Sequence, residues 1–400
     1  MTSKKFHVYD FDRIINRKGT NSYKWDSVEC EEALWVADMD FETAPCVIEA
    51  MKARMEHGCF GYTHVPESYY EAVQWWFGHR HGWTPKREHF IYTSGVVPAI
   101  SAIIKAMTMN VNVDVDVNKF DTGKVKVMTH VPAYNCFFSS IRNNGCEVAP
   151  LHLPRGGEPV ITESLPSGRF RGGYEGLLLL CNPHNPTGHV WRKSELEEIS
   201  EYCHEHHIFV ISDEIHCEFV NPDVDVRYTP FATVAKDDNY AVCISPSKAF
   251  NIAGLQIANI ICPNDEIRQR IDKAININEV CDVNPFGVIA LQAAYTPKGE
   301  EWLTQLNRYI YDNYAYVRDY IIRYIPTWKV SPLEGTYLMW IDIRETGMKA
   351  DALCDKILKE CNVCLSPGTI YGDENYIRLN LATQRARLKD ALEKISKIVK

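Results

Sequence analysis

The sequence predicts an α/β protein, with a mostly parallel central sheet flanked by helices and a smaller α+β domain. Near-continuous apolar runs of strand length alternate with helical patterns through the middle of the chain, as is typical of parallel strands covered on both faces. The last third instead begins with one long helical pattern, which shorter strands and helices follow. With 400 residues the chain is about two to three times a typical domain, so we expect two domains.

Strands and helices are expected to alternate in the middle of the chain. The expected strands are residues 89–93, 125–130, 177–181, 208–212, 240–244 and 256–262. The expected helices between them are residues 96–107, 135–144 and 194–206. In the last helix, Leu196, Ile199 and Cys203 share one face, and Ser194 is the expected N-cap.

The two ends of the chain are expected to form the smaller domain. A helix over residues 299–324 carries aromatic and aliphatic side chains at helical spacing, which predicts a core-facing stripe. The other expected elements are helices 42–56 and 66–77, strand 337–343, helix 350–361, strand 376–382 and helix 384–398. We therefore expect a large domain over residues 45–285 and a discontinuous small domain from residues 1–44 and 286–400.

Charge and composition argue against several classes of partner. The formal net charge is −9 and no long basic run occurs, so nucleic acid and anionic membrane are poor candidates. No run of 18 apolar residues occurs, and no apolar stretch follows Lys4 and Lys5, so we expect neither a membrane span nor a signal peptide. The 14 cysteines are scattered, mostly in apolar surroundings, which favours free thiols and a cytoplasmic location.

Three segments resemble metal or redox motifs without their full pattern. Residues 110–124 begin like a calcium loop, but Lys119 stands where that loop needs glycine, and we expect a surface insertion. Cys361 and Cys364 form a lone CxxC without a partner pair. The histidines of residues 204–207 lack the spacing of a zinc helix, so we expect no metal site.

The strongest functional signal follows three expected strands. Asn185 begins the sequence Asn-Pro-Thr-Gly after the first strand, Asp213 ends the second, and Ser245, Ser247 and Lys248 follow the third. In a parallel sheet all three positions lie at the carboxyl edge, where α/β folds bind ligands. A lysine beside hydroxyls and an acid suits pyridoxal 5'-phosphate, because the amine forms a Schiff base, hydroxyls hold phosphate and a carboxylate keeps the pyridine nitrogen protonated.

These motifs resemble the fold-type I pyridoxal-phosphate enzymes, the aspartate aminotransferase superfamily, over nearly the whole chain. The resemblance implies that Lys248 bonds the cofactor, that Asp213 partners its ring nitrogen and that Asn185 reaches its phenolic oxygen. It also implies that Ser245, with Ser247 nearby, binds the phosphate.

Two further residues match the superfamily pattern. Tyr134, in the sequence Pro-Ala-Tyr, stands where an aromatic ring stacks on the cofactor. Arg378 stands where the substrate α-carboxylate is bound, and a guanidinium fork suits a carboxylate.

Other segments resemble the cystathionine β-lyase/cystalysin branch of C–S lyases. They are residues 11–15, 19–26, 35–41, 61–63, 95–100, 213–216 and 248–255. The resemblance implies that the backbone amides of Val96 and Val97 hold the phosphate and that Tyr62 reaches it from a neighbouring subunit, in a homodimer with shared active sites. His216 replaces a tyrosine of the aspartate aminotransferase pattern and Gln256 replaces an arginine, and both fit this branch.

The implied activity is β-elimination of a small sulfur amino acid to pyruvate, ammonia and a thiol. L-Cystathionine, L-cysteine and cysteine S-conjugates all fit, with Lys248, Tyr62 and Tyr134 in the catalytic group. Two alternatives remain open at this point. An aminotransferase of the same fold would share the early steps, and a non-catalytic binding or regulatory protein would usually have lost the lysine that this chain retains.

Overall fold

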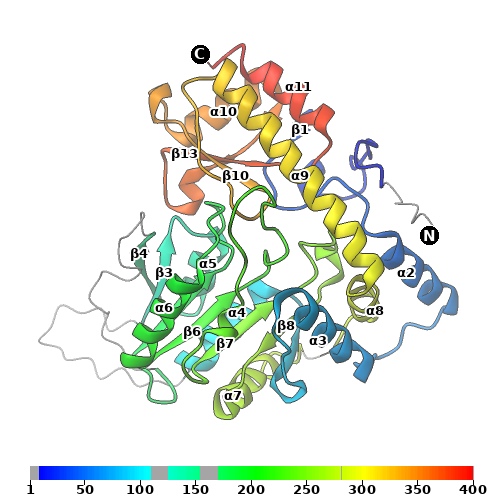
Figure 1. Cartoon of the computed structure of the whole chain (residues 1–400), viewed down its shortest axis with the longest axis vertical. Helices are drawn as coiled ribbons and strands as arrows, with labels where there is room; N and C mark the ends of the chain where they lie inside the picture. Colours follow the sequence, from blue (N-terminus) through cyan, green and yellow to red (C-terminus); the bar gives the residue numbers. More distant parts are fainter. Residues whose placement is uncertain (1–8, 110–124, 154–169, 281, 400) are drawn as a thin grey trace, which may run out of the picture.

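The computed structural model describes residues 9–109, 125–153, 170–280 and 282–399, so the segment 110–124 lies outside the described residues. A seven-stranded sheet forms the centre of the larger part of the chain (Figure 1). Its spatial order is β2 (Phe90–Thr93), β8 (Ala258–Ile261), β7 (Tyr240–Ile244), β6 (Ile208–Asp213), β5 (Gly176–Cys181), β3 (Lys126–Val131) and β4 (Glu147–His152). Only β8 in this sheet runs antiparallel to its neighbours, so the mostly parallel sheet is confirmed.

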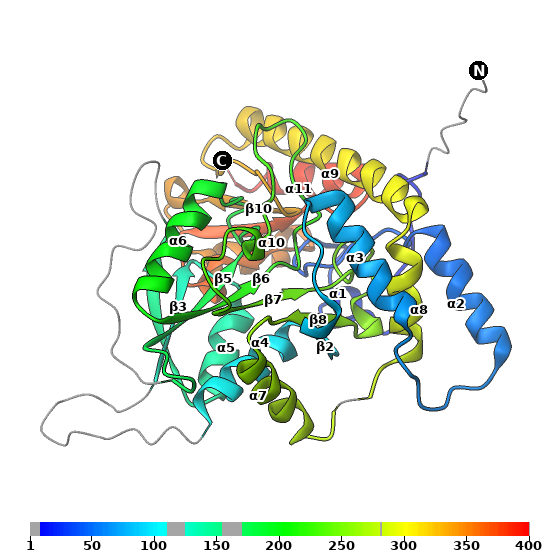
Figure 2. The ribbon, with the colours of Figure 1, turned by 60° about the horizontal axis from the view of Figure 1, so that its bottom comes forward.

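Helices cover both faces of this sheet, because successive strand residues point to opposite sides. Leu177 and Leu179 of β5 join a cluster with α4 (Val96–Thr108), α5 (Asn135–Asn143) and α7 (Asp265–Asn276). Leu178 and Leu180 join the second cluster. The helices that contribute to it include α2 (Pro45–His57), α3 (Glu67–His81), α6 (Lys193–Glu205) and α8 (Pro285–Ala294). Figure 2 shows α4, α5 and α7 on one side of the sheet and α6 on the other.

Helix α6 begins earlier than the sequence predicts. Its N-cap is Arg192, whose backbone N–H donates to Glu195 Oε2 at 2.6 Å, so the prediction of Ser194 as N-cap is wrong. The capping box therefore uses Glu195, three residues after Arg192, and not the carboxylate three residues after Ser194. The predicted apolar face is confirmed, since Leu196 and Ile199 are fully buried.

The last third of the chain forms a second, antiparallel sheet. Its order is β12 (Ser366–Pro367), β13 (Tyr376–Asn380), β10 (Leu338–Asp342) and β9 (Lys329–Val330). Helices α10 (Ala350–Cys361) and α11 (Arg385–Ile395) lie close to it (Figure 1). The long helix α9 (Pro297–Tyr324) buries Trp302, Leu306 and Ile310, as its stripe predicts.

The N-terminal segment packs against this C-terminal part. Strand β1 (Glu32–Ala33) pairs in parallel with β11 (Val363–Cys364), after the short helix α1 (Tyr23–Asp26). This pairing supports a small domain made from both ends of the chain, while its boundaries at residues 44 and 286 stay a prediction. In the described ranges no helix is long and apolar enough to cross a membrane, and every described cysteine is a free thiol.

Candidate active site

Three strands of the central sheet deliver the predicted site residues to one edge. Strands β5, β6 and β7 are parallel, and their register pairs Asp213 with Cys181 on one side and Cys243 on the other. The turn at Asn185 and the segment that ends at Lys248 therefore leave the sheet beside Asp213. Strand β2 runs in the same direction, so the N-terminus of α4 lies at this edge as well.

Asp213 is a buried carboxylate without an ion-pair partner among the described residues. Its side chain accepts one hydrogen bond, from the Ile215 amide to Oδ1 at 3.1 Å. Burial raises the pKa of Asp213 to about 7, although the positive charge of Lys248 opposes that shift. A cationic N–H group beside this carboxylate would restore its usual charged form.

Lys248 is partly buried, and its amine already has a hydrogen-bond acceptor. Nζ donates to the carbonyl of Ala37 at 2.7 Å, and the Tyr337 hydroxyl donates to the same carbonyl at 3.0 Å. Burial lowers the pKa of the Lys248 amine, which favours its neutral form. A neutral amine is the form that attacks an aldehyde or accepts a proton.

Arg378 is a buried cation on β13 without an ion-pair partner in the described part of the chain. Its Nη1 donates to Asn185 Oδ1 at 3.1 Å and its Nη2 to the Trp35 carbonyl at 2.8 Å. The guanidinium lies 4.6 Å from the ring centroid of Tyr371, and Nε has no hydrogen-bond partner. Because neutral groups leave its charge uncompensated, the site is suited to a carboxylate ligand.

Tyr134 and His216 lie close to these charged groups. Tyr134 is the N-cap of α5, and its pKa is raised mainly by burial, with Arg378 and Asp213 among the charges that act on its phenol. His216 is buried, with Nδ1 unpartnered and its ring centroid 5.6 Å from that of Tyr337. Burial holds the pKa of His216 well below its usual range, so its ring is neutral.

The N-terminus of α4 provides backbone donors. Its N-cap is Gly95, which supplies no side-chain cap, and the amides of Val96 and Val97 lie in the first turn, where helical amides have no intrahelical acceptor. Ser245 Oγ instead donates to the Ile257 carbonyl at 2.6 Å and accepts from the Ser247 amide at 3.0 Å. The Ser245 hydroxyl hydrogen is therefore already donated within the chain. The roles of Ser245 and Ser247 toward phosphate stay predictions.

Tyr62 is not brought to the site within one chain. Its side chain is 96% exposed, in a segment between α2 and α3 that is neither helix nor strand. No hydrogen bond or ring contact recorded for the described residues joins it to Lys248 or Arg378. The contribution of Tyr62 from a neighbouring subunit stays a prediction.

The unpaired buried groups fit pyridoxal phosphate. Asp213 lacks the cation that a protonated ring nitrogen would supply, and His216 Nδ1 lacks a partner. The buried Lys248 amine is available for the aldehyde, and the first turn of α4 offers amides for the phosphate. No group in this set conflicts with the cofactor's charges.

Three contributors to the site were not predicted from the sequence. They are the carbonyl of Ala37, the hydroxyl of Tyr337 and the ring of Tyr371. A backbone carbonyl has no side-chain signature, and the sequence pattern identifies Tyr337 only as the first residue of an expected strand. Residues 35–41 carried the family resemblance, which was the available signal for Ala37.

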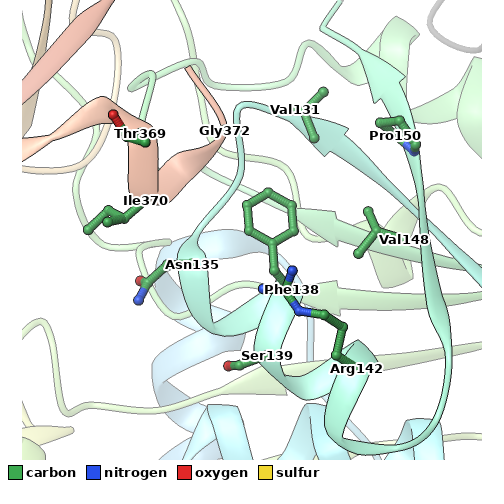
Figure 3. Close-up of a pocket in the computed structure, with 10 residues that line it drawn as sticks. All are labelled: Val131, Asn135, Phe138, Ser139, Arg142, Val148, Pro150, Thr369, Ile370 and Gly372. Carbon is green, nitrogen blue, oxygen red and sulfur yellow. The ribbon is translucent and has the colours of Figure 1, made fainter. Parts of the chain in front are cut away.

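A separate groove of about 670 Å³ lies on the outer face of α5 (Figure 3). Asn135, Phe138 and Arg142 line one side, and Thr369 and Ile370 line the other. None of the predicted site residues is in its lining, so it is distinct from the cluster around Lys248.

Comparison with known proteins identifies the family. The model of the aminotransferase class I and II family matches residues 33–395. The chain belongs to this family. Cystathionine beta-lyase PatB of Bacillus subtilis is 35% identical to this chain over 398 aligned residues. The alignment covers 96% of this chain and 98% of PatB.

Solved structures of the family have the same fold. Cystalysin from Treponema denticola, which contains a pyridoxal 5'-phosphate cofactor, has a TM-score of 0.85 and 29% identity, with 98% of each chain covered. The PLP-bound C–S lyase from Staphylococcus hominis has a TM-score of 0.83 and 30% identity, with 97% of this chain and 98% of that chain covered. These similarities support the predicted C–S lyase branch within the aminotransferase class I and II family.

Proposed function

We propose that this protein is a pyridoxal-phosphate-dependent C–S β-lyase. It converts L-cystathionine or a cysteine S-conjugate, with one water, to pyruvate, ammonia and a thiol, and L-cysteine to pyruvate, ammonia and hydrogen sulfide. The observation that carries the proposal is the buried group formed by an amine at Lys248, a carboxylate at Asp213 and an uncompensated guanidinium at Arg378. The names of PatB and of the Staphylococcus hominis lyase support the carbon–sulfur chemistry.

The residues that would hold the cofactor are Lys248, Asp213 and the first turn of α4. Lys248 would bond its aldehyde carbon, Asp213 would accept from its ring nitrogen, and the amides of Val96 and Val97 would bind its phosphate. Tyr134 would stack on the cofactor ring, and His216 would lie beside that ring. When bound, pyridoxal phosphate supplies an electron sink for the charge that develops at the substrate Cα.

Arg378 and Lys248 are the residues that contact the substrate in this proposal. The Arg378 fork binds the α-carboxylate, with Asn185 holding one arm of the guanidinium. Lys248 Nζ, whose pKa burial lowers, then takes the Cα proton. The electron pair that this leaves expels the β-thiolate as the Cβ–S bond breaks, and water later releases ammonia and pyruvate.

The assembly and location follow from the same proposal. Tyr62 acts on the phosphate of a neighbouring subunit, so the active unit is a homodimer, which its 96% exposure in one chain supports. The free thiols of the described residues favour a cytoplasmic location.

A side-by-side assay tests the proposed activity. Purified protein with pyridoxal phosphate is incubated with L-cystathionine, L-cysteine and S-alkyl cysteines, and pyruvate, ammonia and thiol are measured. We expect the three products in equal amounts from at least one substrate, without any added 2-oxoacid. Amino-group transfer that requires a 2-oxoacid and releases no thiol would show that the protein is an aminotransferase instead.

A further inference from the structure

Residues 35–41, here called the strap, have an unusual pattern of hydrogen bonds. The strap contains neither helix nor strand, yet each of its seven carbonyls accepts a hydrogen bond from a side chain elsewhere in the chain. Asn380 Nδ2 donates to two of these carbonyls, each at 2.6 Å. Asn251 Nδ2 donates to two others, at 3.0 and 2.9 Å. Side chains, not a backbone ladder, therefore determine the path of the strap.

Two side chains of the proposed active site donate to the strap. Lys248 donates to the carbonyl of Ala37, and Arg378 donates to the carbonyl of Trp35, two residues earlier. Arg378 is buried and Lys248 is partly buried, and neither has an ion-pair partner among the described residues. A shift of the strap by a fraction of an ångström would change both contacts together, since hydrogen bonds weaken steeply with geometry.

A group of four charges fixes the strap on its other side. Arg17 donates to both carboxylate oxygens of Asp38, at 3.1 and 2.7 Å, and to Asp40 Oδ1 at 2.9 Å. Lys24 pairs with Asp40 at 2.8 Å, and both of these side chains are fully buried. Two cations face two anions, so the group is neutral and its arrangement is specific.

Arg17 is the member of this group that bears most directly on the strap. Besides its two carboxylate partners, it donates to the carbonyl of Met39 at 2.8 Å, so it contacts three successive strap residues. Its side chain is 21% exposed, whereas Lys24 is completely buried. A substitution at Arg17 is therefore made at a side chain that reaches solvent, whereas one at Lys24 would be made in the core.

We propose that Arg17 is a positioning residue of the active site. By fixing the strap, it sets the positions of the Ala37 and Trp35 carbonyls and thereby those of the Lys248 amine and the Arg378 guanidinium. The proposal rests on the proposed function, because those two groups matter only if the cofactor and the substrate carboxylate bind there. It adds a residue that lies outside the site to the set that determines its geometry.

The test compares Arg17→Met with Arg13→Met in the protein loaded with pyridoxal phosphate. Arg13 belongs to the same N-terminal segment, but its carboxylate partner is Glu42, outside the strap, and both side chains are more than half exposed. Two readouts do not depend on turnover. One is the dissociation constant of a simple carboxylate, propionate, which reports on Arg378, and the other is the pH midpoint of the cofactor's visible absorbance, which reports on Lys248.

For Arg17→Met we expect propionate binding to weaken by about tenfold or more, as loss of a hydrogen bond to a charged group allows. We also expect the pH midpoint to move by about half a unit or more. The cofactor should still be reduced onto Lys248, and Arg13→Met should change the dissociation constant by less than about twofold. Values for Arg17→Met within about twofold of wild type would overturn the proposal, even if the variant were less stable, because the role would then be structural.

A second variant keeps the test decisive if Arg17→Met does not fold. Asp38→Asn retains the size of the side chain and leaves the Arg17 contacts with Asp40 and Met39 in place. We expect changes in the same direction but smaller, and an unchanged propionate affinity would overturn the proposal. A wild-type protein that holds no cofactor on Lys248 would instead contradict the proposed function, before any variant is compared.

Discussion

At the residue scale, the site depends on charges that the protein buries without neutralising them. Asp213 has a raised pKa because burial disfavours its charged form, and Arg378 has neutral acceptors only. Taking such groups out of water costs free energy. A ligand that carries a cationic ring nitrogen and a carboxylate compensates both, which explains why these residue types stand at these positions.

Replacing Asp213 by asparagine should uncouple cofactor binding from turnover. The amide keeps the size of the side chain and the bond from the Ile215 amide, but it cannot hold the ring nitrogen protonated. We expect kcat to fall by about a hundredfold or more, a barrier change of about 2.7 kcal/mol, while the cofactor still binds. Steady-state kinetics beside the exposed control Asp223→Asn will test this, and a turnover within about threefold of wild type would exclude the assigned role.

The same substitution should change how the stability of the cofactor-free protein depends on pH. The pKa of Asp213 is raised from 3.8 to about 7 in the folded chain, so the folded state holds this proton more tightly than the unfolded state. Wild type therefore loses stability as pH rises from about 4 to about 7, at about 1.4 kcal/mol per unit of pH. Asp213→Asn removes this loss, because an amide does not titrate.

Denaturant unfolding at two pH values measures the difference. Between pH 5 and pH 8 the stability of Asp213→Asn relative to wild type should rise by about 2–3 kcal/mol, both proteins being free of cofactor. A difference that stays constant over this range would mean that Asp213 is already charged at pH 5 in the folded chain.

At the element scale, short connections at the ends of β5, β6 and β7 position the site. The turn from Asn185 to Gly188 is held against the segment that precedes β10, since the Gly188 carbonyl accepts from the amides of Glu334 and Gly335 at 3.1 and 2.8 Å. This contact joins the turn that carries Asn185 to the part of the chain that carries Arg378, and the two side chains meet.

Gly188→Ala should disturb this contact. Gly188 has a φ of +75°, and an added Cβ would lie 2.5 Å from Leu333 Cδ1 and 3.1 Å from the Gly335 carbonyl oxygen. Gly145→Ala is the matched control, with a φ of +77° and nothing within 4 Å of the added atom. We expect Gly188→Ala to lower the free energy of unfolding by about 1–2 kcal/mol more than the control does, and equal losses would show that the turn has room to adjust.

The elements were largely predictable, and the reasons for the exceptions are physical. Apolar runs and helical spacing located β5, β6, β7 and α9, because burial on both sides leaves a clear pattern. Strand β4 was not predicted, since it lies at an edge of the sheet and Pro150 interrupts its apolar residues. The site residues that follow strands were predictable from their position, whereas Ala37 acts through its backbone and carries no such signal.

At the scale of the whole molecule, the active site draws on both ends of the chain. Asp213 ends a strand of the large sheet, Lys248 follows the next strand, and Arg378 comes from the second sheet. The strap accepts hydrogen bonds from both Lys248 and Arg378. Tyr62 lies outside this arrangement and is almost fully exposed, which is why we expect a neighbouring subunit to use it.

Mixing two inactive variants tests whether the site is shared. If Tyr62 serves the other subunit, heterodimers of Tyr62→Phe and Lys248→Ala contain one site with both changes and one with neither. After random exchange about half of the dimers are heterodimers, so activity should recover to roughly a quarter of wild type. Tyr62→Phe must first be at least about tenfold impaired. No recovery after verified exchange would mean that each site is self-contained.

Reductive trapping of the cofactor tests the central claim most directly. The protein is loaded with pyridoxal phosphate, treated with borohydride and digested, and the modified lysine is located by peptide mass spectrometry. The account predicts modification at Lys248, with none in Lys248→Ala, because the buried amine beside Asp213 forms the covalent link. Cofactor found on any other lysine, or retained covalently by Lys248→Ala, would contradict the assignment of the site.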